Sequence, residues 1–400
     1  MTLRVLAVSH VFPRSAQDPS APFLLTWARG LHDAGASVGV VVPHDAGLPG
    51  RHEVSGVPVR RVRYASDDAE VIAYRGEMHQ LVRSPRGLLG LAALVEATAV
   101  AVRVQARAGG ADVVHVHWWV PSLLAVRLAR PSAGVVVTLH GTDVALLESR
   151  PQLVPLARWA LACADRVEAV SSDLAGRLER ATGRRADGLN PMPLKPAWFA
   201  VARPPRATPD SDRSSAAPQL LGVGRLVPDK GFADLLDAVA LLGRPVRVRL
   251  VGEGPQREAL AARAATLNLD LELIGRIDTG SLRAAYAAAD LVVQPSHREG
   301  LGLVAAEGLL AGVPVVATDS GGVRDVLPDS RLVPVGDVPA LAAAIARQLD
   351  DPDRTWVHTA AERLRTRLTP SASAARTLQG YTASLDLAPP APPSPDSGPG

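Results

Sequence analysis

The chain alternates short apolar runs with longer segments of helical periodicity. Residues 3–9 and 38–42 are short apolar runs, typical of buried parallel strands, and residues 26–35 between them have helical spacing and end at a glycine. Further strands are expected at 57–63, 113–116, 135–139 and 166–170, with helices at 88–108, 121–130 and 153–162. This alternation predicts a parallel sheet with helices on both faces.

The same alternation restarts after residues 203–218, where Pro, Ser, Ala, Asp and Arg crowd together as in a linker. In the second half, strands are expected at 219–223, 246–251, 271–274, 291–294 and 313–317, and helices at 232–242, 255–267, 281–289, 303–311 and 338–349. We therefore predict an α/β fold of two Rossmann-like domains, with a ligand site in the cleft between them.

The length of 400 residues also favours two domains. The predicted boundaries are an N-terminal domain over 1–200, a linker over 201–218 and a C-terminal domain over 219–370. A helix near 371–385 is expected to pack back onto the N-terminal domain. The proline-rich segment 387–400 is expected to be a disordered tail.

Charge excludes one class of partner. The 43 basic and 40 acidic side chains leave a formal net charge of +3, which is too small to predict nucleic-acid binding. One basic cluster stands out, formed by Arg51, Arg60, Arg61 and Arg63. We interpret it as a solvated strand face, with contact to an anionic membrane surface or an acidic acceptor as the alternative.

Targeting signals are weak. Cys163 is the single cysteine, so no intramolecular disulfide can form. Residues 1–10 lack the basic start and long apolar core of a signal peptide, and the apolar stretch 88–102 is short for a membrane span and interrupted by Glu96. We expect a soluble, cytoplasmic protein, with weak peripheral contact at the inner face of the membrane as an added expectation.

The first chemical motif is the segment 222–231, Gly-Val-Gly-Arg-Leu-Val-Pro-Asp-Lys-Gly. A strand ends in glycines, and Arg225 and Lys230 follow before the next helix. Glycines let the backbone approach a bulky anion, and two cations can hold a diphosphate between them. The plain alternative is a strand-to-helix turn with two surface cations.

The second motif is the segment 295–307, in which Glu299 precedes Gly-Leu-Gly and a helix that runs through Glu307. A helix start with glycines offers free N–H groups to phosphate oxygens. Carboxylates beside a phosphate are suited to accept hydrogen bonds from the hydroxyls of a sugar or ribose. Acidic residues that complement the helix dipole are the alternative; next to the Arg225 and Lys230 motif, ligand binding is favoured.

The first half carries polar groups at the ends of two expected strands, in the segments 113–119 and 135–143. His140 is followed by a glycine, and we predict that it contacts a ligand. His115 and His117 share a strand face, but no third ligand at a suitable spacing completes a zinc site. Two roles stay open for Trp118 and Trp119, namely stacking on a sugar and filling the core.

Together these motifs resemble the retaining family-4 glycosyltransferases, which have the GT-B fold. The resemblance rests on Gly-x-Gly-Arg-Leu-x-x-x-Lys-Gly at 222–231 and on Glu-x7-Glu at 299–307, followed by Gly-Val-Pro-Val-Val-Ala-Thr-Asp-Ser-Gly-Gly at 312–322. His-Gly-Thr-Asp at 140–143 also matches, although the first half is looser. The resemblance extends from residue 3 to about residue 335 and implies that the first domain binds the acceptor and the second the nucleotide sugar.

The resemblance also implies roles for individual residues. The implied catalytic residues are His140, Arg225, Lys230 and Glu299. By the resemblance, Arg225 and Lys230 hold the donor diphosphate in place of a metal, and His140 and Glu299 bind the donor sugar. The resemblance implies that Glu307 binds the ribose and that Arg276 and Ile277 lie near the base. The full set of further donor-binding residues is Gly224, Arg276, Ile277, Gly300, Leu301, Gly302, Leu303 and Glu307. No cofactor or metal is expected besides the nucleotide sugar as co-substrate.

The acceptor site is less defined. Where family members often carry a glycine-rich loop after the first strand, this chain has Asp-Pro-Ser-Ala-Pro-Phe at 18–23. The acceptor candidates are Ser9, His10, Trp118, Trp119 and Asp143. The resemblance implies retaining transfer of a hexose or N-acetylhexosamine, from a UDP-sugar before a GDP-sugar, to a hydroxyl in envelope glycoconjugate, polysaccharide or natural-product biosynthesis. A nucleotide-sugar epimerase, a phosphorylase and a non-catalytic carbohydrate-binding protein are the alternatives, and the oligomeric state stays open.

Overall fold

The computed structural model describes residues 2–18, 20–74, 84–199 and 217–385. The chain divides into two compact units, Met1–Leu194 with Pro370–Gly400, and Lys195–Thr369. The predicted tail and all but two residues of the predicted linker lie outside the described residues. Each unit contains an α/β sheet, so the predicted fold class of two Rossmann-like domains is confirmed.

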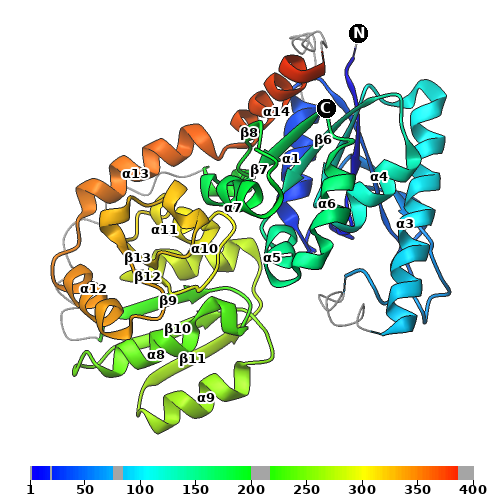
Figure 1. Ribbon diagram of the computed structural model, residues 1–400. Helices are drawn as coiled ribbons and strands as arrows, with labels where there is room; N and C mark the ends of the chain where they lie inside the picture. The colour runs from blue at the N-terminus through cyan, green and yellow to red at the C-terminus, as the bar shows by residue number, and fades with distance from the viewer. Residues whose placement is uncertain (1, 19, 75–83, 200–216, 386–400) are drawn as a thin grey trace. The chain divides into compact units, whose positions relative to one another are not determined.

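The first unit is built on an eight-stranded sheet whose central strands are parallel (Figure 1). In spatial order its strands are β3 (Arg51–Val54), β4 (Val57–Val62), β2 (Ser37–Pro43), β1 (Arg4–Val8), β5 (Val113–His117), β6 (Gly134–Leu139), β7 (Arg166–Ala169) and β8 (Gly188–Leu189). Every residue of β5 is buried, as expected for a Val-rich strand covered on both faces.

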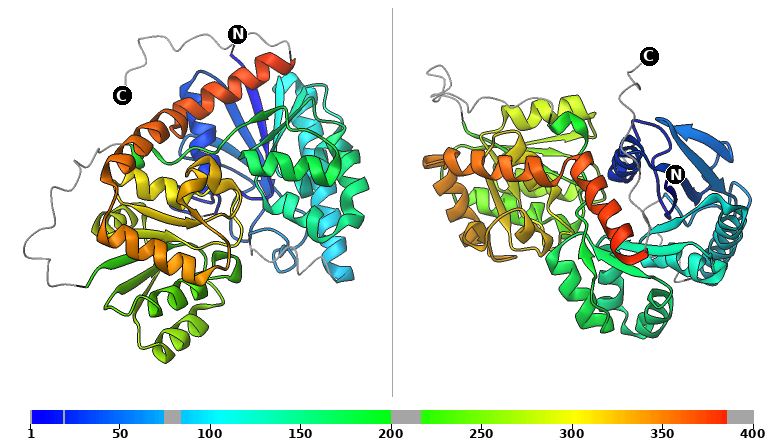
Figure 2. Two further views of the ribbon diagram at one scale, coloured as in Figure 1. Left: turned by 60° about the vertical axis from the view of Figure 1, so that its left-hand side comes forward. Right: turned by 90° about the horizontal axis from the view of Figure 1, so that it is seen from above.

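Helices cover both faces of this sheet (Figure 2). They are α1 (Pro22–Asp33), α3 (Pro85–Gln105), α4 (Leu124–Ala129), α5 (Thr142–Ser149), α6 (Val154–Leu161), α7 (Ser172–Thr182) and α14 (Pro370–Leu385). Helix α14, drawn in red, lies beside α1, drawn in blue (Figures 1 and 2). Helix α14, the last among the described residues, therefore belongs to the first unit.

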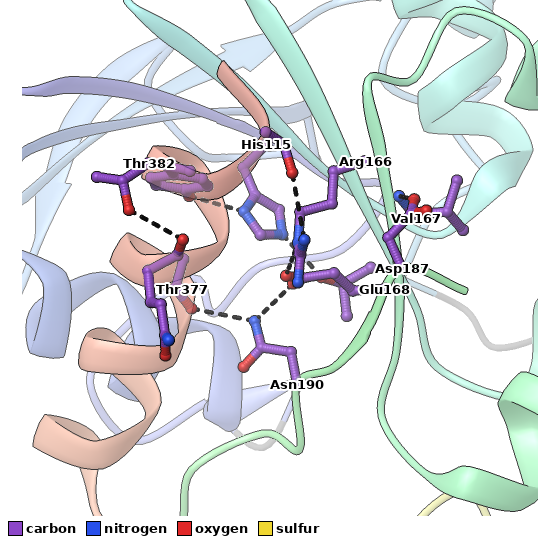
Figure 3. Close-up of polar contacts among 12 residues, drawn as sticks. His115, Arg166, Val167, Glu168, Asp187, Asn190, Thr377 and Thr382 are labelled. Atoms are coloured by element: carbon purple, nitrogen blue, oxygen red, sulfur yellow. Dashed lines mark hydrogen bonds and ion pairs between the residues drawn. The ribbon is translucent and has the colours of Figure 1, made fainter. Parts of the chain in front are cut away.

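A buried polar network anchors α14 to the sheet (Figure 3). The Asn190 amide donates to Glu168 at 2.8 Å and to Thr377 of α14 at 3.0 Å, and Arg166 donates to the other oxygen of Glu168 at 2.7 Å. His115 Nδ1 lies 2.7 Å from the Tyr381 hydroxyl on the same helix. These hydrogen bonds join β5 and the β7–β8 segment to α14 and so fix the register of α14 on the sheet.

The second unit contains a six-stranded parallel sheet with helices α8 to α13. Its strands in spatial order are β11 (Asp270–Gly275), β10 (Arg247–Val251), β9 (Gln219–Val223), β12 (Leu291–Gln294), β13 (Val315–Thr318) and β14 (Leu332–Val333). Its helices are α8 (Phe232–Ala240), α9 (Arg257–Thr266), α10 (Thr279–Ala288), α11 (Leu303–Leu310), α12 (Val338–Asp350) and α13 (Arg354–Arg367). Parallel strands place the loops that follow them at one edge of the sheet.

The structure corrects several details of the expected elements. Strand β3 pairs antiparallel with β4, and helices α7 and α13 were not expected from the sequence. Arg61, assigned above to a solvated strand face, is 3% exposed and donates to the Tyr74 hydroxyl and the Pro13 carbonyl. Both terminal nitrogens of the buried guanidinium thus have hydrogen-bond partners, which offsets part of the cost of burying its charge.

Candidate active site

One ion pair joins the two motifs of the second unit. Lys230 Nζ donates to Glu299 Oε1 at 2.5 Å, and the Ser296 hydroxyl donates to the same oxygen at 2.8 Å. Lys230 follows β9 and Glu299 follows β12, which are neighbouring strands. The two segments therefore converge at the carboxyl edge of the sheet, although 69 positions separate these residues in the chain.

Glycine geometry allows the Lys230 loop to lie where it does. Gly231 has a φ of +64° and precedes α8. A Cβ at this position would collide with the carbonyl oxygen of Pro295, at the end of β12. Only a glycine permits this close approach without strain.

The Glu299 loop is tied to the loop that follows β13. The Glu299 N–H donates to the Ser320 carbonyl at 2.8 Å, and the Gly322 N–H donates to the Glu299 carbonyl at 3.3 Å. A Cβ on Gly322 would collide with the Gly300 carbonyl oxygen. These hydrogen bonds hold the Glu299 backbone in place and so help to position its carboxylate next to Lys230.

Helix α11 begins beside this carboxylate. Its N-cap, Gly302, has a φ of +81°, and the Ala305 N–H donates to the buried side chain of Gln294 at 2.8 Å. The first amides of a helix have no intrahelical acceptor and favour an anion. Leu301 is 6% exposed, so any ligand contact there involves its backbone. The turn at 300–303 thus presents N–H groups on the same edge as Lys230.

Glu307 lies one turn further along α11. The Tyr286 hydroxyl of α10 donates to Glu307 Oε2 at 2.7 Å. Burial raises the pKa of Glu307 to about 7, although the Tyr286 hydrogen bond and the Lys195 ammonium lower it. Lys195 itself donates to Thr279 at 3.0 Å. Lys195 and Tyr286 belong to no motif, so no local pattern predicts that they lie near Glu307.

The remaining predicted donor contacts occupy loops at the same edge. The side chain of Arg225 is exposed and makes no hydrogen bond or ion pair with any residue that the structure describes, while its backbone carbonyl accepts the Val227 N–H at 2.9 Å. Gly224 before it has a φ of +155°. Arg276 is exposed and Ile277 half-buried in the loop between β11 and α10. These residues lie on loops after β9 and β11 and can reach different parts of an extended ligand.

In the first unit, two histidines at adjacent strand ends contact each other. His117 is the last residue of β5 and His140 follows β6; His117 Nδ1 lies 3.1 Å from His140 Nε2. Burial, and then the neighbouring imidazoles, hold the pKa of His117 and of His140 well below the usual value. Both rings are therefore neutral near pH 7, and one nitrogen of the pair must donate to the other.

Aromatic rings surround His140. The Trp118 ring centroid lies 4.1 Å from that of His140 and 4.6 Å from that of His10, and the Phe23 centroid lies 5.3 Å from His140. Trp118 is 8% exposed and has a φ of +65°, an unfavourable conformation for a bulky residue. The indole thus packs on His140, which favours the second of the two roles left open for it.

Trp119 and Asp143 shape this region from below the surface. Trp119 is 1% exposed and its indole N–H donates to the Asp143 carbonyl at 2.9 Å. The Asp143 carboxylate, 3% exposed, accepts the N–H of Gly141 at 2.8 Å. Because both residues are buried, neither presents a surface to an acceptor, so Trp119 takes the core role that was one of its two alternatives and Asp143 does not have the acceptor role expected for it. Both residues hold the turn that carries His140.

The loop after β1 is also internally bonded. The Ser9 hydroxyl donates to the Val11 carbonyl at 2.6 Å and its side chain is 2% exposed, so this acceptor candidate offers no surface to a ligand. Burial lowers the pKa of His10 to about 4. In the segment 18–23, Asp18 accepts hydrogen bonds from Arg14 at 2.6 Å and from the Ser20 N–H at 3.0 Å.

The paired histidines of β5 are not arranged as metal ligands. Both ring nitrogens of His115 have partners, Tyr381 and Thr138, and the His115 and His117 rings stack at 4.8 Å. Over the described part of the chain, one cluster, His44 with Asp67 and Glu70, brings ligand atoms within 4.8 Å of one another. Both His44 nitrogens are already bonded there, to Glu70 and to the Leu48 carbonyl.

Comparison with known proteins identifies related sequences and folds. A family model described as "Glycosyl transferase 4-like domain" matches residues 20–194, and one described as "Glycosyl transferases group 1" matches residues 217–351. The chain is 30% identical over 360 residues to 2-deoxystreptamine glucosyltransferase of Streptomyces kanamyceticus, covering 82% of this chain and 89% of that protein.

Solved structures share the fold. Sucrose-phosphate synthase from Thermosynechococcus elongatus superposes with a TM-score of 0.76 at 24% identity, covering 96% of this chain and all of that one. HepE from Anabaena, solved in complex with UDP and glucose, has a TM-score of 0.67 at 19% identity, covering 95% of this chain and 100% of that one. At these identities the likeness concerns the fold alone.

Proposed function

This chain belongs to the family-4 glycosyltransferases of the GT-B fold, and we propose that it transfers a hexose or N-acetylhexosamine from a nucleotide diphosphate sugar to a hydroxyl acceptor with retention of configuration. The observation that carries the proposal is the convergence of Lys230, Glu299 and the first turn of α11 at one sheet edge. Cations and free amides beside hydroxyl-accepting carboxylates suit a pyrophosphate bonded to a sugar.

In the proposed donor complex, Arg225, Lys230 and the amides of residues 300–303 bind the diphosphate. Glu299 accepts hydrogen bonds from the hydroxyls of the donor sugar, and Glu307 accepts them from the hydroxyls of the ribose. Arg276 and Ile277 lie beside the base. UDP is proposed before GDP as the nucleotide, and the complex of HepE with UDP and glucose on the same fold supports a nucleotide-sugar donor.

Catalysis consists of stabilising the leaving diphosphate. As the glycosidic bond breaks, negative charge grows on the phosphate oxygens, which the two cations and the helix amides face. Removing one such donor from a site typically raises the barrier by about 3–4 kcal/mol. The acceptor hydroxyl attacks the same face that the diphosphate leaves, and a donor phosphate oxygen takes its proton. No metal is required in this scheme, because Arg225 and Lys230 supply the positive charge.

The acceptor is proposed to bind near His10, His140 and Trp118 of the first unit. The relative named for glucosyl transfer to 2-deoxystreptamine matches over most of this chain, which supports a small polyhydroxylated natural product as one acceptor to test. A hydroxyl group of such a compound is the proposed nucleophile.

We further propose a cytoplasmic protein with weak peripheral membrane contact through α3. By length and composition α3 could cross a membrane, with 33% of its apolar window buried, although one such helix is weak support for a span. Leu88 and Leu89 are 54% and 71% exposed, and Arg60 and Arg63 line a hollow beside the same helix. Vesicle sedimentation tests this proposal: the protein is expected to sediment with anionic vesicles and not with zwitterionic ones. The double variant Leu88→Ser/Leu89→Ser is expected to lose this binding.

The function is tested by incubating the full chain with UDP-glucose, UDP-N-acetylglucosamine or GDP-mannose and 2-deoxystreptamine, with and without EDTA. Mass spectrometry is expected to show a glycosylated product and a free nucleoside diphosphate, unaffected by EDTA, and NMR an α-anomeric linkage from an α-linked donor. Conversion of the donor to an epimer, phosphate-dependent release of a sugar phosphate, or binding without turnover would each contradict the proposal.

A further inference from the structure

The imidazole pair at the ends of β5 and β6 sets which atoms His140 offers to a ligand. His140 Nε2 faces His117 Nδ1 at 3.1 Å, so Nε2 is already engaged. His140 Nδ1 makes no hydrogen bond within the described part of the chain, and His140 is half-buried at the surface of the unit. Nδ1 is therefore the ring atom through which His140 can contact a ligand.

The surroundings of His117 decide the direction of the bond. His117 is 1% exposed, and its Nε2 is buried without a hydrogen-bond partner. If His117 carried its proton on Nε2, a buried N–H would be left unpaired. If the proton is on Nδ1, the unpaired group is an acceptor, and unpaired buried acceptors are less rare than unpaired buried N–H groups.

We infer that His117 is a positioning residue: its Nδ1–H donates to His140 Nε2 and thereby fixes His140 as the Nδ1–H tautomer, which presents a hydrogen-bond donor to the ligand. The ligand atom that His140 meets is then an oxygen acting as acceptor, such as a sugar hydroxyl or phosphate oxygen. The tautomer assignment itself needs no ligand, whereas its use in transfer rests on the proposed function.

Packing keeps this pair in register. Trp27 lies edge-to-face with both His117 at 4.7 Å and His115 at 4.8 Å, and the His115 ring stacks on that of His117 at 4.8 Å. The Trp118 ring packs against His140 at 4.1 Å with an interplanar angle of 32°. The Trp27 indole N–H is used elsewhere, donating to Thr377 at 3.2 Å. A rival arrangement has His117 Nε2–H directed at the Trp27 ring, but such N–H···π contacts are weaker than an N–H···N bond.

The direct test is nitrogen NMR of the free protein labelled with 15N-histidine, with His140 assigned by His140→Gln. The wild type is expected to show His140 protonated on Nδ1 and unprotonated on Nε2. His117→Asn keeps an amide N–H near the position of Nδ1 and is expected to preserve this tautomer. His117→Leu removes the donor, and His117→Gln moves its amide away from it; both are expected to release His140 to the other tautomer.

Kinetics supply the functional readout. His117→Leu and His117→Gln are expected to lower kcat/KM by about tenfold or more, the effect of one misdirected hydrogen bond, while His117→Asn stays within about threefold of the wild type. Melting temperatures and circular dichroism verify folding. Comparing the kinetics of His117→Asn with those of His117→Gln separates the effect of the donor position from that of a cavity, because both variants place an amide in the site.

The inference is overturned if wild-type His140 carries its proton on Nε2, as the Trp27-directed arrangement requires, or if His117→Leu leaves the Nδ1–H tautomer in place. A correct tautomer in a protein that transfers no sugar would instead refute the proposed function alone. Equal kinetics for the Asn and Gln variants, with both tautomers as expected, would refute the role of His117 in positioning the ligand contact.

Discussion

Lys230 Nζ donates to Glu299 Oε1 at 2.5 Å, and this bond places an ammonium and a carboxylate, with side chains 25% and 12% exposed, at the start of helix α11. The pair satisfies both charges before any ligand binds. A diphosphate can compete for the Lys230 protons while sugar hydroxyls occupy Glu299. Donor binding is therefore expected to replace the Lys230–Glu299 bond by contacts of each side chain with the ligand.

Removing either cation of the proposed diphosphate site should impair transfer. Lys230→Ala and Arg225→Ala are each expected to lower kcat by about 10²–10³-fold, because the charge on the leaving group loses one of its donors. Steady-state assays with circular dichroism measure this. Arg249→Ala, which removes an arginine of β10 paired with Glu272 of β11, is the matched control and should keep wild-type turnover. Near wild-type turnover of Lys230→Ala would show that it does not bind the diphosphate.

Glu307 should make the enzyme discriminate against deoxyribose. With Oε2 bonded to Tyr286, the other carboxylate oxygen is the proposed acceptor of a ribose hydroxyl proton. A donor sugar on deoxyuridine diphosphate leaves that oxygen poorly satisfied, at a cost of about 1–3 kcal/mol. Competition between matched UDP- and dUDP-sugars measures the ratio of kcat/KM. Glu307→Gln should reduce the preference for the UDP-sugar. If the wild type and Glu307→Gln had the same ratio of kcat/KM, Glu307 would not bind the ribose hydroxyl.

Nucleotide affinity should depend on pH through the same carboxyl group. The folded pKa of about 7 lies above the usual value of 4.5, so the carboxylate that accepts hydrogen bonds from hydroxyls becomes the main form only above about pH 7. UDP binding is therefore expected to weaken by up to about tenfold per pH unit below that value. Calorimetry between pH 5.5 and 8.5 checks this. Glu307→Gln should flatten the profile, and a profile that is flat in the wild type would contradict the assignment.

The same raised pKa has a consequence for stability. A carboxyl group whose pKa is higher in the folded than in the unfolded state stabilises the fold when protonated, and that contribution fades as pH rises toward about 7. The free energy of unfolding of Glu307→Gln, relative to the wild type, should therefore increase between pH 5 and pH 8. Denaturant titrations at both values measure the difference, and a constant difference would exclude the linkage.

Glu168 should contribute strongly to the stability of the first unit. Its carboxylate accepts from Arg166 at 2.7 Å and Asn190 at 2.8 Å, next to α14 (Figure 3). Glu168→Ala leaves these buried partners unpaired and is expected to cost about 3–5 kcal/mol of unfolding free energy. Glu179→Ala, which breaks an exposed pair with Arg185, should cost below about 1 kcal/mol. A cost of Glu168→Ala below about 1 kcal/mol, as expected for the control, would show that the network adds little stability.

The sequence was sufficient for the fold class because the strands are short Val-rich runs buried on both faces, which only a helix-covered parallel sheet provides. It was also sufficient to locate the segments 222–231 and 295–307, since glycines with cations or acids have few structural explanations. Strand β3 was missed because Arg51–Val54 has no continuous apolar run. Helix α13 was missed because its surface is highly charged, with buried residues limited to Val357, Ala360, Ala361 and Leu364.

Side-chain partners were harder to predict. Trp119, Asp143 and Ser9 carry groups that commonly bind sugars, but their burial depends on packing between segments far apart in the chain. Tyr286 meets Glu307 only because α10 lies next to α11, and no local pattern reports that contact. The pairing of His117 with His140 likewise depends on β5 and β6 being neighbours.

A crystal structure of the full chain with bound UDP tests the central claim most directly. The account predicts the diphosphate against Arg225, Lys230 and the first amides of α11, with the ribose hydroxyls on Glu307. A nucleotide bound elsewhere, or one held with Lys230 still paired to Glu299 and remote from the phosphates, would contradict it.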